Sequence, residues 1–471
     1  MSTTQSATMS QFRHSATVAI ADIRLQGALT GATNKFVNGR TTALTELPDA
    51  DALRDQFKSI RAATLANLAH YLELFEQRAT AAGAQVHWAP TGQDAVDIVL
   101  GIARQRGVQL VTKSKSMVSE EIHLNAALEA NHIEPVETDL GEWIVQLAQE
   151  PPSHIIGPAI HKTRQQVAAL FSAQVGRELP ADDIDGLTAE ARRMLRTKFL
   201  AAGMGISGGN LGIAETGTLV LVTNEGNGRL VTSAPPVHIA IMGIEKICPD
   251  WDAAAVWLAL LARSATGQPM SIYTTAITGP RRADDPDGPE EVHIILLDNG
   301  RSQLAGTPYE EILQCIRCGA CLNVCPVYKK AGGHAYGSPY SGPVGAVVTP
   351  LLFGLEEYAA LPQASTLCGA CKDVCPARID LPRMLLQLRQ DEVAAHLLPW
   401  RERKAEEFAA FVLGSEGRMN FFTKLGRWGQ RPFLRDGSLN LPVNVGDGRA
   451  LPTLAPRPFR KLWADGELDN A

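Results

Sequence analysis

Seven of the eight cysteines in this chain stand in two short runs in its last third. The first run consists of Cys315, Cys318, Cys321 and Cys325, followed by a proline, and the second of Cys368, Cys371 and Cys375, also followed by a proline. Three thiolates at intervals of three residues wrap one iron–sulfur cubane, and a fourth before a proline reaches a second cubane. The spacing therefore predicts two [4Fe–4S] clusters, which accept and release electrons singly.

The same rule predicts how the thiolates divide between the clusters, because the last cysteine of each run ligates the cluster of the other run. Cluster 1 is expected on Cys315, Cys318, Cys321 and Cys375, and cluster 2 on Cys325, Cys368 and Cys371. One iron of cluster 2 is then left without a cysteine. Ser365 stands where the missing thiolate would be, so Ser365, water or a partner's group can be its ligand, or the iron can be lost to leave a three-iron cluster.

Zinc is the main alternative for these cysteines, since pairs with the spacing C-x2-C also bind tetrahedral Zn²⁺. Zinc sites usually combine two pairs from separate knuckles. Here a third cysteine and then a Cys-Pro follow the pair of the first run, and a Cys-Pro follows the pair of the second, which favours the cubanes. Disulfides are not expected in a reducing cytosol. Cys248 stands alone and is interpreted as a small buried residue.

The composition is that of an ordinary globular chain of 471 residues, with 45% hydrophobic residues and a net charge of -6. This charge does not favour a nucleic-acid partner. The longest apolar runs, such as 253–262, are shorter than the ~18–20 residues that span a bilayer, and the N-terminal sequence does not resemble a secretory signal. We therefore expect no transmembrane segment and a cytoplasmic location, with peripheral association to the inner face of the membrane as an option.

The periodicity of the chain divides it into four parts. Residues 1–75 have helical spacing, with Leu65, Leu68, Leu72 and Phe75 expected on one face, and predict an N-terminal helical arm. Residues 76–300 alternate apolar strands with amphipathic helices and predict an α/β domain with a largely parallel sheet. Residues 301–395 carry the cysteines and predict a mainly helical domain of the ferredoxin type. Residues 396–471 predict a helical appendage that ends in a loose, proline-rich tail.

Within the α/β region, LGIAETGTLVLVTNEG and RLVTSAPPVHIAIMG predict two adjacent strands. Gly203, Gly205 and Gly208 fit G-x-G-x-x-G, but a helix precedes them and a strand follows, which is the reverse of a dinucleotide site. The glycines are therefore expected to allow turns and close backbone approach.

Other polar residues of the α/β region give weaker signals. Lys113 and Lys115 stand where a strand ends and a helix begins, a position at which α/β folds bind anions, although surface solvation is the simpler interpretation. Glu215 is flanked by small residues and points either into a cleft or to solvent. The histidines show no metal-ligand spacing: His154, His161, His238 and His293. No catalytic residue is assigned.

Five segments together resemble the lactate-utilisation iron–sulfur protein family of the B-subunit type. They are TKSKSMVSEEIHLNAALEANHIEPVETDLGEWIVQLA, SHIIGPAIHK, GISGGNLGIAETGTLVLVTNEGNGRLVTSAPPVHIAIMGIEKI, QCIRCGACLNVCPVY and STLCGACKDVCPARI, and the resemblance spans nearly the whole chain. It implies that the α/β part is a lactate-utilisation domain with a sugar-phosphate-isomerase-like sheet. It also implies that the shortened second motif, with Ser365, is typical of the family.

The resemblance further implies a role in oxidising L-lactate to pyruvate, with this chain as an electron carrier. The expected partners are a second iron–sulfur protein, another lactate-utilisation-domain subunit and a respiratory electron acceptor. Two one-electron clusters suit a reaction that releases two electrons. A competing hypothesis makes the α/β domain itself catalytic on a 2-hydroxy acid or a phosphorylated ligand, with polar groups around Glu215 and Lys113 and with the clusters as electron outlet. A third makes the clusters purely structural.

Overall fold

The computed structural model describes residues 9–398, 400–435, 438–439 and 451–466. The chain forms two compact units, Met1–Glu392 and Val393–Ala471. The first contains the helical arm, the α/β region and both cysteine runs. No helix in the described ranges is long and apolar enough to cross a membrane.

Four helices form the N-terminal arm, namely α1 (Met9–Ala21), α2 (Ile23–Thr45), α3 (Ala50–Ala66) and α4 (Leu68–Ala81). Asp22 caps α2, because its carboxylate accepts hydrogen bonds from the first backbone N–H groups of that helix. The helix expected around Leu65 to Phe75 is interrupted at Asn67. Leu72 and Phe75 on α4 are buried as expected.

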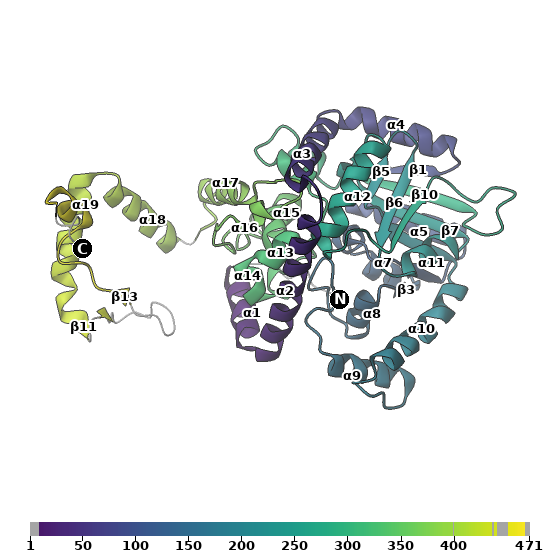
Figure 1. Ribbon diagram of the computed structural model, residues 1–471, viewed down its shortest axis with the longest axis horizontal. Helices are drawn as coiled ribbons and strands as arrows, with labels where there is room; N and C mark the ends of the chain where they lie inside the picture. The colour runs from purple at the N-terminus through teal and green to yellow at the C-terminus, as the bar shows by residue number, and fades with distance from the viewer. Residues whose placement is uncertain (1–8, 399, 436–437, 440–450, 467–471) are drawn as a thin grey trace. The chain divides into compact units, whose positions relative to one another are not determined.

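A six-stranded parallel sheet forms the centre of the α/β region (Figure 1). Its order is β1 (Gln85–Ala89), β10 (Glu291–Leu297), β7 (Val237–Gly243), β4 (Met204–Gly208), β2 (Leu110–Lys113) and β3 (Glu134–Glu137). All five pairings are parallel, which confirms the predicted sheet. The connecting helices are α5 (Gly92–Gln105), α6 (Met117–Glu121), α7 (Leu124–Ala130), α8 (Leu140–Leu147), α9 (Arg164–Val175), α10 (Ile184–Ala201) and α11 (Asn227–Ser233).

Both faces of this sheet are covered, as the continuous apolar strands require. Ile239 and Ile241 of β7 pack with the helices α5 and α7 on one face. Ala240 and Met242 of the same strand point to the other face, where they pack with α4 and the second sheet. Alternation along the strand therefore places the α/β core between two layers.

A second sheet of four strands was not predicted from the sequence. It contains β8 (Ile247–Cys248), β5 (Leu211–Ile213), β6 (Thr218–Thr223) and β9 (Tyr273–Ile277) in that order. The prediction of two adjacent strands is wrong, because β6 belongs to this sheet, β7 to the parallel sheet, and α11 lies between them in the chain. The turn after β5 lets β6 fold back antiparallel on it, so the two apolar runs face different partners.

The cysteine region is made of short helices and turns, namely η3 (Glu310–Gln314), α13 (Ala320–Val324), α14 (Pro326–Ala331), α15 (Gly342–Phe353), α16 (Ala370–Asp373) and α17 (Leu381–Ala394). It shares one hydrophobic core with α2, α3 and α12 (Trp251–Ala265). Trp257 of α12 and Phe57 of α3 belong to that core and lie edge to face. The cysteine region is thus packed against the arm and the α/β domain rather than tethered to them.

The second unit contains α18 (Trp400–Leu413), α19 (Glu416–Gly429), α20 (Phe459–Ala464) and a small antiparallel sheet of β11 (Leu434–Arg435), β12 (Ser438–Leu439) and β13 (Leu451–Pro452). Its helices agree with the predicted helical appendage. The prediction of a loose tail falls partly on 436–437, 440–450 and 467–471, which lie outside the described residues.

Candidate iron–sulfur centre and adjoining cavity

The two cysteine runs have the same local backbone. Cys318 and Cys368 are each followed by a glycine with positive φ, Gly319 at 75° and Gly369 at 85°, and then by a short helix. Only glycine adopts this left-handed conformation without strain, and it lets the chain turn back so that the next thiol faces the previous ones. The similarity of the two turns explains why both runs contain the sequence C-G-A-C, at 318–321 and 368–371.

The effects of the cysteines on one another's pKa values indicate which of them are neighbours. Burial, together with Cys375 and Cys315, raises the pKa of Cys318 to about 12. Burial, together with Cys325 and Cys368, raises the pKa of Cys371 to about 12. Two thiolates repel each other appreciably only at short range, so these effects on the pKa identify neighbouring cysteines. Cys375 thus neighbours the first run and Cys325 the second.

These thiols do not converge as the ligands of a single ion. Tetrahedral zinc with bonds of about 2.3 Å holds its sulfurs about 3.8 Å apart. Among the described residues, which include every cysteine, the one group of three or more possible ligand atoms within 4.8 Å of one another is Glu150, His161 and His334, with no sulfur in it. The cysteine sulfurs are therefore spread more widely than zinc requires, which fits a larger cofactor such as a cubane.

The second run reaches the surface of the molecule. Cys368 is exposed, and hydrogen bonds from the backbone N–H of Ala370 and from Thr366 lower its pKa. Ser365 is partly buried, and its Oγ accepts a hydrogen bond from the N–H of Leu367 at 3.1 Å. The hydroxyl predicted as one option for the open iron is therefore engaged in a turn of the backbone.

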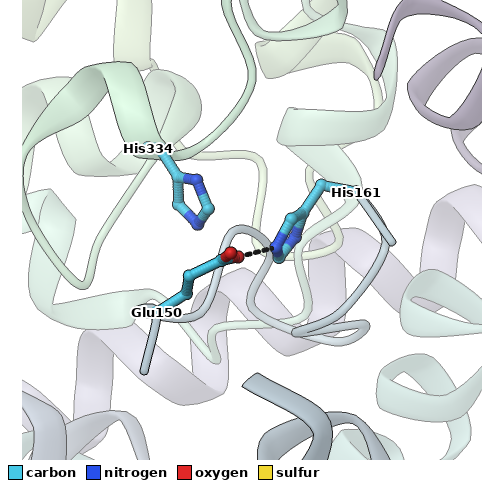
Figure 2. A group of neighbouring side chains, drawn as sticks. All are labelled: Glu150, His161 and His334. Carbon is cyan, nitrogen blue, oxygen red and sulfur yellow. Dashed lines mark hydrogen bonds and ion pairs between the residues drawn. The ribbon is translucent and has the colours of Figure 1, made fainter. Parts of the chain in front are cut away.

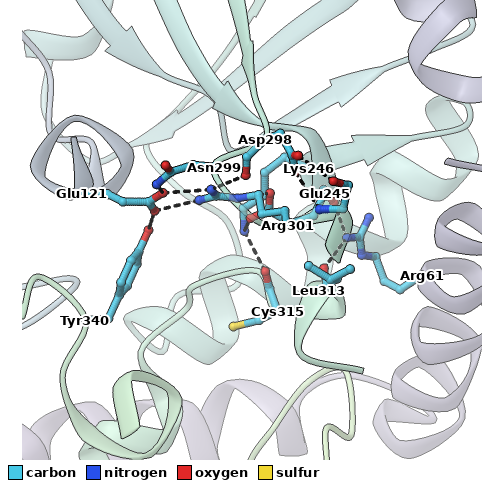
Figure 3. Close-up of polar contacts among 11 residues, drawn as sticks. Arg61, Glu121, Glu245, Lys246, Asp298, Asn299, Arg301, Leu313, Cys315 and Tyr340 are labelled. Carbon is cyan, nitrogen blue, oxygen red and sulfur yellow. Dashed lines mark hydrogen bonds and ion pairs between the residues drawn. The ribbon is translucent and has the colours of Figure 1, made fainter. Parts of the chain in front are cut away.

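A buried polar network joins the α/β domain to the first cysteine run (Figure 3). Arg301, after β10, donates two hydrogen bonds to the carboxylate of Glu121 on α6, at 2.9 and 2.7 Å. Tyr340 of the cysteine region donates to the same carboxylate at 2.5 Å. All three side chains are almost fully buried. The carboxylate of Glu121 therefore links elements that are far apart in the sequence.

The network continues to the backbone of the cluster motif. Burial alone would raise the pKa of Glu245, but Arg301 and Lys246 lower it to about 2, so this carboxylate is charged. Lys246 Nζ donates to the carbonyl oxygen of Cys315 at 2.7 Å. Arg61 of α3 donates to the carbonyl oxygen of Leu313 at 3.0 Å, just before that cysteine. Two cationic side chains, Lys246 and Arg61, thus hold the segment that leads into the first run (Figure 3).

A cavity of about 400 Å³ lies beside this network. Lys115, Asp139 and Glu225 line it from the α/β domain, and Ile316, Arg317 and Tyr340 line it from the cysteine region. Ile316 and Arg317 stand between Cys315 and Cys318 in the sequence. The wall of the cavity is therefore formed in part by the segment that carries two predicted ligands of cluster 1.

The polar residues that the sequence singled out in the α/β region lie in different environments. Lys113 is fully buried and donates to Glu137 and Asn125, both at 2.5 Å, so its interpretation as a solvated surface residue is wrong. Lys115 lines the cavity. Glu215 is exposed and does not line it, so the structure lacks the polar site around Glu215 and Lys113 that would have favoured the competing catalytic hypothesis.

Several other residues that the sequence singled out have structural roles. A Cβ at Gly205 would lie 1.9 Å from the carbonyl oxygen of Val231 on α11, so this glycine allows close helix–strand packing, as expected. Cys248 is buried and its Sγ donates to the carbonyl oxygen of Asp250 at 3.3 Å, which also agrees with the sequence. His238 is bonded to Ser207 and His293 to His87 within the sheet.

Two histidines instead join the α/β domain to the cysteine region. His154 is bonded to Asn323 of α13 at 3.1 Å. His161 is bonded to Glu150 at 2.8 Å, and His334 lies beside them (Figure 2). These three groups are close enough to ligate one ion. The oxygens of Glu150 already accept hydrogen bonds from His161 and Lys162, so the group has a structural role as it stands.

Sequence reasoning missed Glu121, Arg301, Tyr340, Lys246 and Arg317 altogether. Each is a common residue type in a stretch without a motif, and these residues meet only through tertiary packing. The one usable signal was the isolated charge of Arg317 inside the cysteine run.

Two family models agree with this architecture. A family model described as the LUD domain matches residues 72–297, and one described as a 4Fe-4S dicluster domain matches residues 311–379. A crystal structure of a DUF162 family protein from Deinococcus radiodurans aligns with 49% of this chain and 98% of its own, at 13% identity and a TM-score of 0.28.

Curated relatives are much more similar. Lactate utilization protein B of Bacillus licheniformis is 44% identical over 421 residues, which cover 88% of this chain and 87% of that protein. The protein of the same name from Geobacillus thermodenitrificans is 44% identical over 94% of this chain and 90% of its own. In this chain the two family models thus place a LUD domain before a 4Fe–4S dicluster domain. The chain belongs to the lactate utilization protein B family.

Proposed function

We propose that this chain is the iron–sulfur electron-transfer subunit of a complex that oxidises L-lactate to pyruvate. Membership of the family supports a role in lactate utilisation with iron–sulfur chemistry. Two [4Fe–4S] clusters, when bound, supply two one-electron carriers. Cys315, Cys318, Cys321 and Cys375 hold cluster 1, and Cys325, Cys368 and Cys371 hold cluster 2.

The observation that carries the proposal is that one cysteine of the second set is exposed, whereas no cysteine of the first set is. Cys318 of the first set is buried, and the residues beside it line the cavity. Cys368 of the second set is exposed to solvent. Cys325 belongs to the first run and neighbours the second, whereas Cys375 belongs to the second run and neighbours the first. The two sets are therefore directly adjacent. This order suits electrons that enter near the cavity and leave at the surface.

The partners that the family resemblance implies are a companion iron–sulfur protein, a companion LUD-domain protein and a respiratory acceptor, and we propose them for this chain. Exposed Cys368 and the incomplete thiolate set around it are where a partner would accept electrons. A location at the inner face of the membrane would bring that exit close to a respiratory acceptor.

The cavity favours a second candidate function, in which the α/β domain of this chain itself binds and oxidises the hydroxy acid. The two candidates differ in which subunit removes hydrogen from lactate. An anaerobic assay of the iron-replete chain with L-lactate and an artificial acceptor separates them. We expect no acceptor reduction by the chain alone and reduction once the companion subunits are added. Reduction by the chain alone would replace the first candidate by the second.

A further inference from the structure

The cavity at the junction of the two domains contains cationic groups with unused hydrogen-bonding capacity. Lys115, Lys246 and Arg317 line it. Nη1 of Arg317 is buried and has no hydrogen-bond partner among the described residues. An unpaired buried donor costs free energy, so a cavity that keeps one favours an acceptor from outside. The guanidinium lies 4.7 Å from the ring centroid of Tyr340, which orients it.

The two lysines leave further donors free. Lys115 Nζ donates to the carbonyl oxygen of Ile156 at 2.7 Å, and Lys246 Nζ to that of Cys315 at 2.7 Å. An ammonium group has three N–H donors, and each of these two lysines uses one of them in the hydrogen bond just described. Donors from two domains therefore border one space.

The carboxylates in the wall are already engaged. Asp139 accepts hydrogen bonds from the first N–H groups of α8, and Glu225 accepts one from the N–H of Leu140 at 3.2 Å. Glu245 pairs with Arg301 at 2.8 Å. Asp139 also pairs with Lys115 at 3.7 Å, and Glu245 lies 4.0 Å from Lys246, so an anion in the cavity competes with these carboxylates for the ammonium groups. Nη1 of Arg317 has no such competitor and remains for a ligand. Small anions are the class of molecule that this arrangement recognises.

The wall of the cavity also contains apolar side chains among its polar ones. Ile156, Leu221 and Ile316 line the cavity together with the donors. A planar carboxylate fits the fork of a guanidinium, and a short aliphatic group beside it fits the branched side chains. The position of Ile316 between Cys315 and Cys318 places such a ligand next to the segment that holds cluster 1.

From these contacts we infer that the cavity is a binding site for a small 2-hydroxy or 2-oxo carboxylate, held by Arg317 and Lys115. This inference deepens the proposed function, on which it rests, by naming the place in this chain where a substrate or product carboxylate binds. It assigns no hydrogen transfer to the site. The volume of about 400 Å³ falls within the ~300–1,000 Å³ of small-molecule pockets.

Calorimetric titration of the full, iron-replete chain under anaerobic conditions tests the inference. The probes are L-lactate, pyruvate, the neutral analogue L-lactamide and inorganic phosphate. The variants are Arg317→Gln and Lys115→Gln, of which the second is remote in sequence from the cysteines. Lys198→Gln is the matched control, because Lys198 also belongs to the α/β domain and pairs with an acidic residue, Glu134, outside the cavity.

We expect one saturable site for L-lactate or pyruvate and no binding of L-lactamide. Each cavity variant should weaken the binding of the carboxylate by about tenfold or more at unchanged iron content. The reason is that a charged hydrogen bond contributes ~1.5–3 kcal/mol to binding. Lys198→Gln should bind as the wild type does. Absence of saturable carboxylate binding, equal affinity in all variants, or preference for phosphate would each overturn the inference.

The result is distinct from a failure of the proposed function. If the clusters are reduced and reoxidised reversibly but no carboxylate binds, the electron-transfer role stands and the cavity assignment falls. If a carboxylate binds with the expected dependence on Arg317 but the clusters accept no electrons, the assignment stands and the electron-transfer role falls.

Discussion

Lys246 of the α/β domain donates a hydrogen bond, 2.7 Å long, to the carbonyl oxygen of Cys315, the first cysteine of the first run. The lysine follows Glu245, which pairs with Arg301, so this contact is the end of a buried network. A positive charge so close to a predicted cluster ligand favours the more negative, reduced form of a cluster. Through Lys246 the α/β domain would therefore tune the reduction potential of the proposed cluster 1.

Replacing Lys246 with methionine should lower the reduction potential of one cluster only. The loss of a buried positive charge destabilises the reduced state, by on the order of tens of millivolts, since ~59 mV corresponds to a tenfold change for one electron. A redox titration followed by paramagnetic resonance measures this shift. Lys198→Met serves as the control, and an equal shift of both clusters, or of neither, would argue against the assignment.

Replacing Arg301 with leucine should destabilise the first unit strongly. It leaves the carboxylates of Glu121 and Glu245 buried without their main partner, and breaking a buried pair in this way costs about 3–5 kcal/mol. We expect a large drop in the thermal midpoint, measured by circular dichroism on the anaerobic protein. Arg106→Leu removes an ion pair with Glu291 that is partly exposed, and it should have a small effect. Similar drops for both variants would contradict the importance of the network.

Replacing Ser365 with alanine should leave the iron content and the resonance spectrum nearly unchanged. Its Oγ already accepts a hydrogen bond from Leu367, and a hydroxyl is a poor ligand compared with a thiolate. Ser365→Cys offers an eighth thiolate and should lower the potential of cluster 2. Disappearance of one cluster's signal in the alanine variant would show instead that Ser365 holds the fourth iron.

Replacing Glu392 with glutamine should stabilise the protein in alkaline solution. Burial raises the pKa of Glu392 to about 7, even though Gln363 donates a hydrogen bond to it. Because the folded state binds this proton more tightly than the unfolded state, its contribution to stability is present below pH ~4.5 and declines up to pH ~7. The thermal midpoint of Glu392→Gln should exceed that of the wild type at pH 8 but not at pH 5. A gain of equal size at both values would exclude titration of Glu392 as the cause.

The parallel sheet was predictable because its strands are short apolar runs separated by amphipathic helices. The second sheet was not, since β5 and β6 have the same apolar pattern as the strands of the first sheet, and only packing against α12 separates them. Sequence separation also hid the polar network, because Glu121, Arg301 and Tyr340 carry no local pattern. The residue spacing that defines the cysteine runs is local, so their shared turn at Gly319 and Gly369 could be anticipated.

The cavity, too, could be predicted only in part from the sequence. The sequence singled out Lys115 because it follows a strand. Arg317 and Lys246, which line the same cavity, come from other elements, and the sequence did not single them out. The failed expectation around Lys113 has a physical cause. Lys113 and Lys115 point in the same direction only in an extended strand, whereas β2 ends at Lys113, and the chain turns into α6 soon after.

The most direct test of this account is the content and redox stoichiometry of the clusters. We expect the anaerobically purified chain to contain about eight irons and about eight acid-labile sulfides, and to take up two electrons in two one-electron steps. Cys368→Ala should abolish the step of the solvent-exposed cluster and leave the other. Stoichiometric zinc without labile sulfide, or clusters that bind but accept no electrons, would contradict the central claim that this chain carries electrons through two [4Fe–4S] clusters.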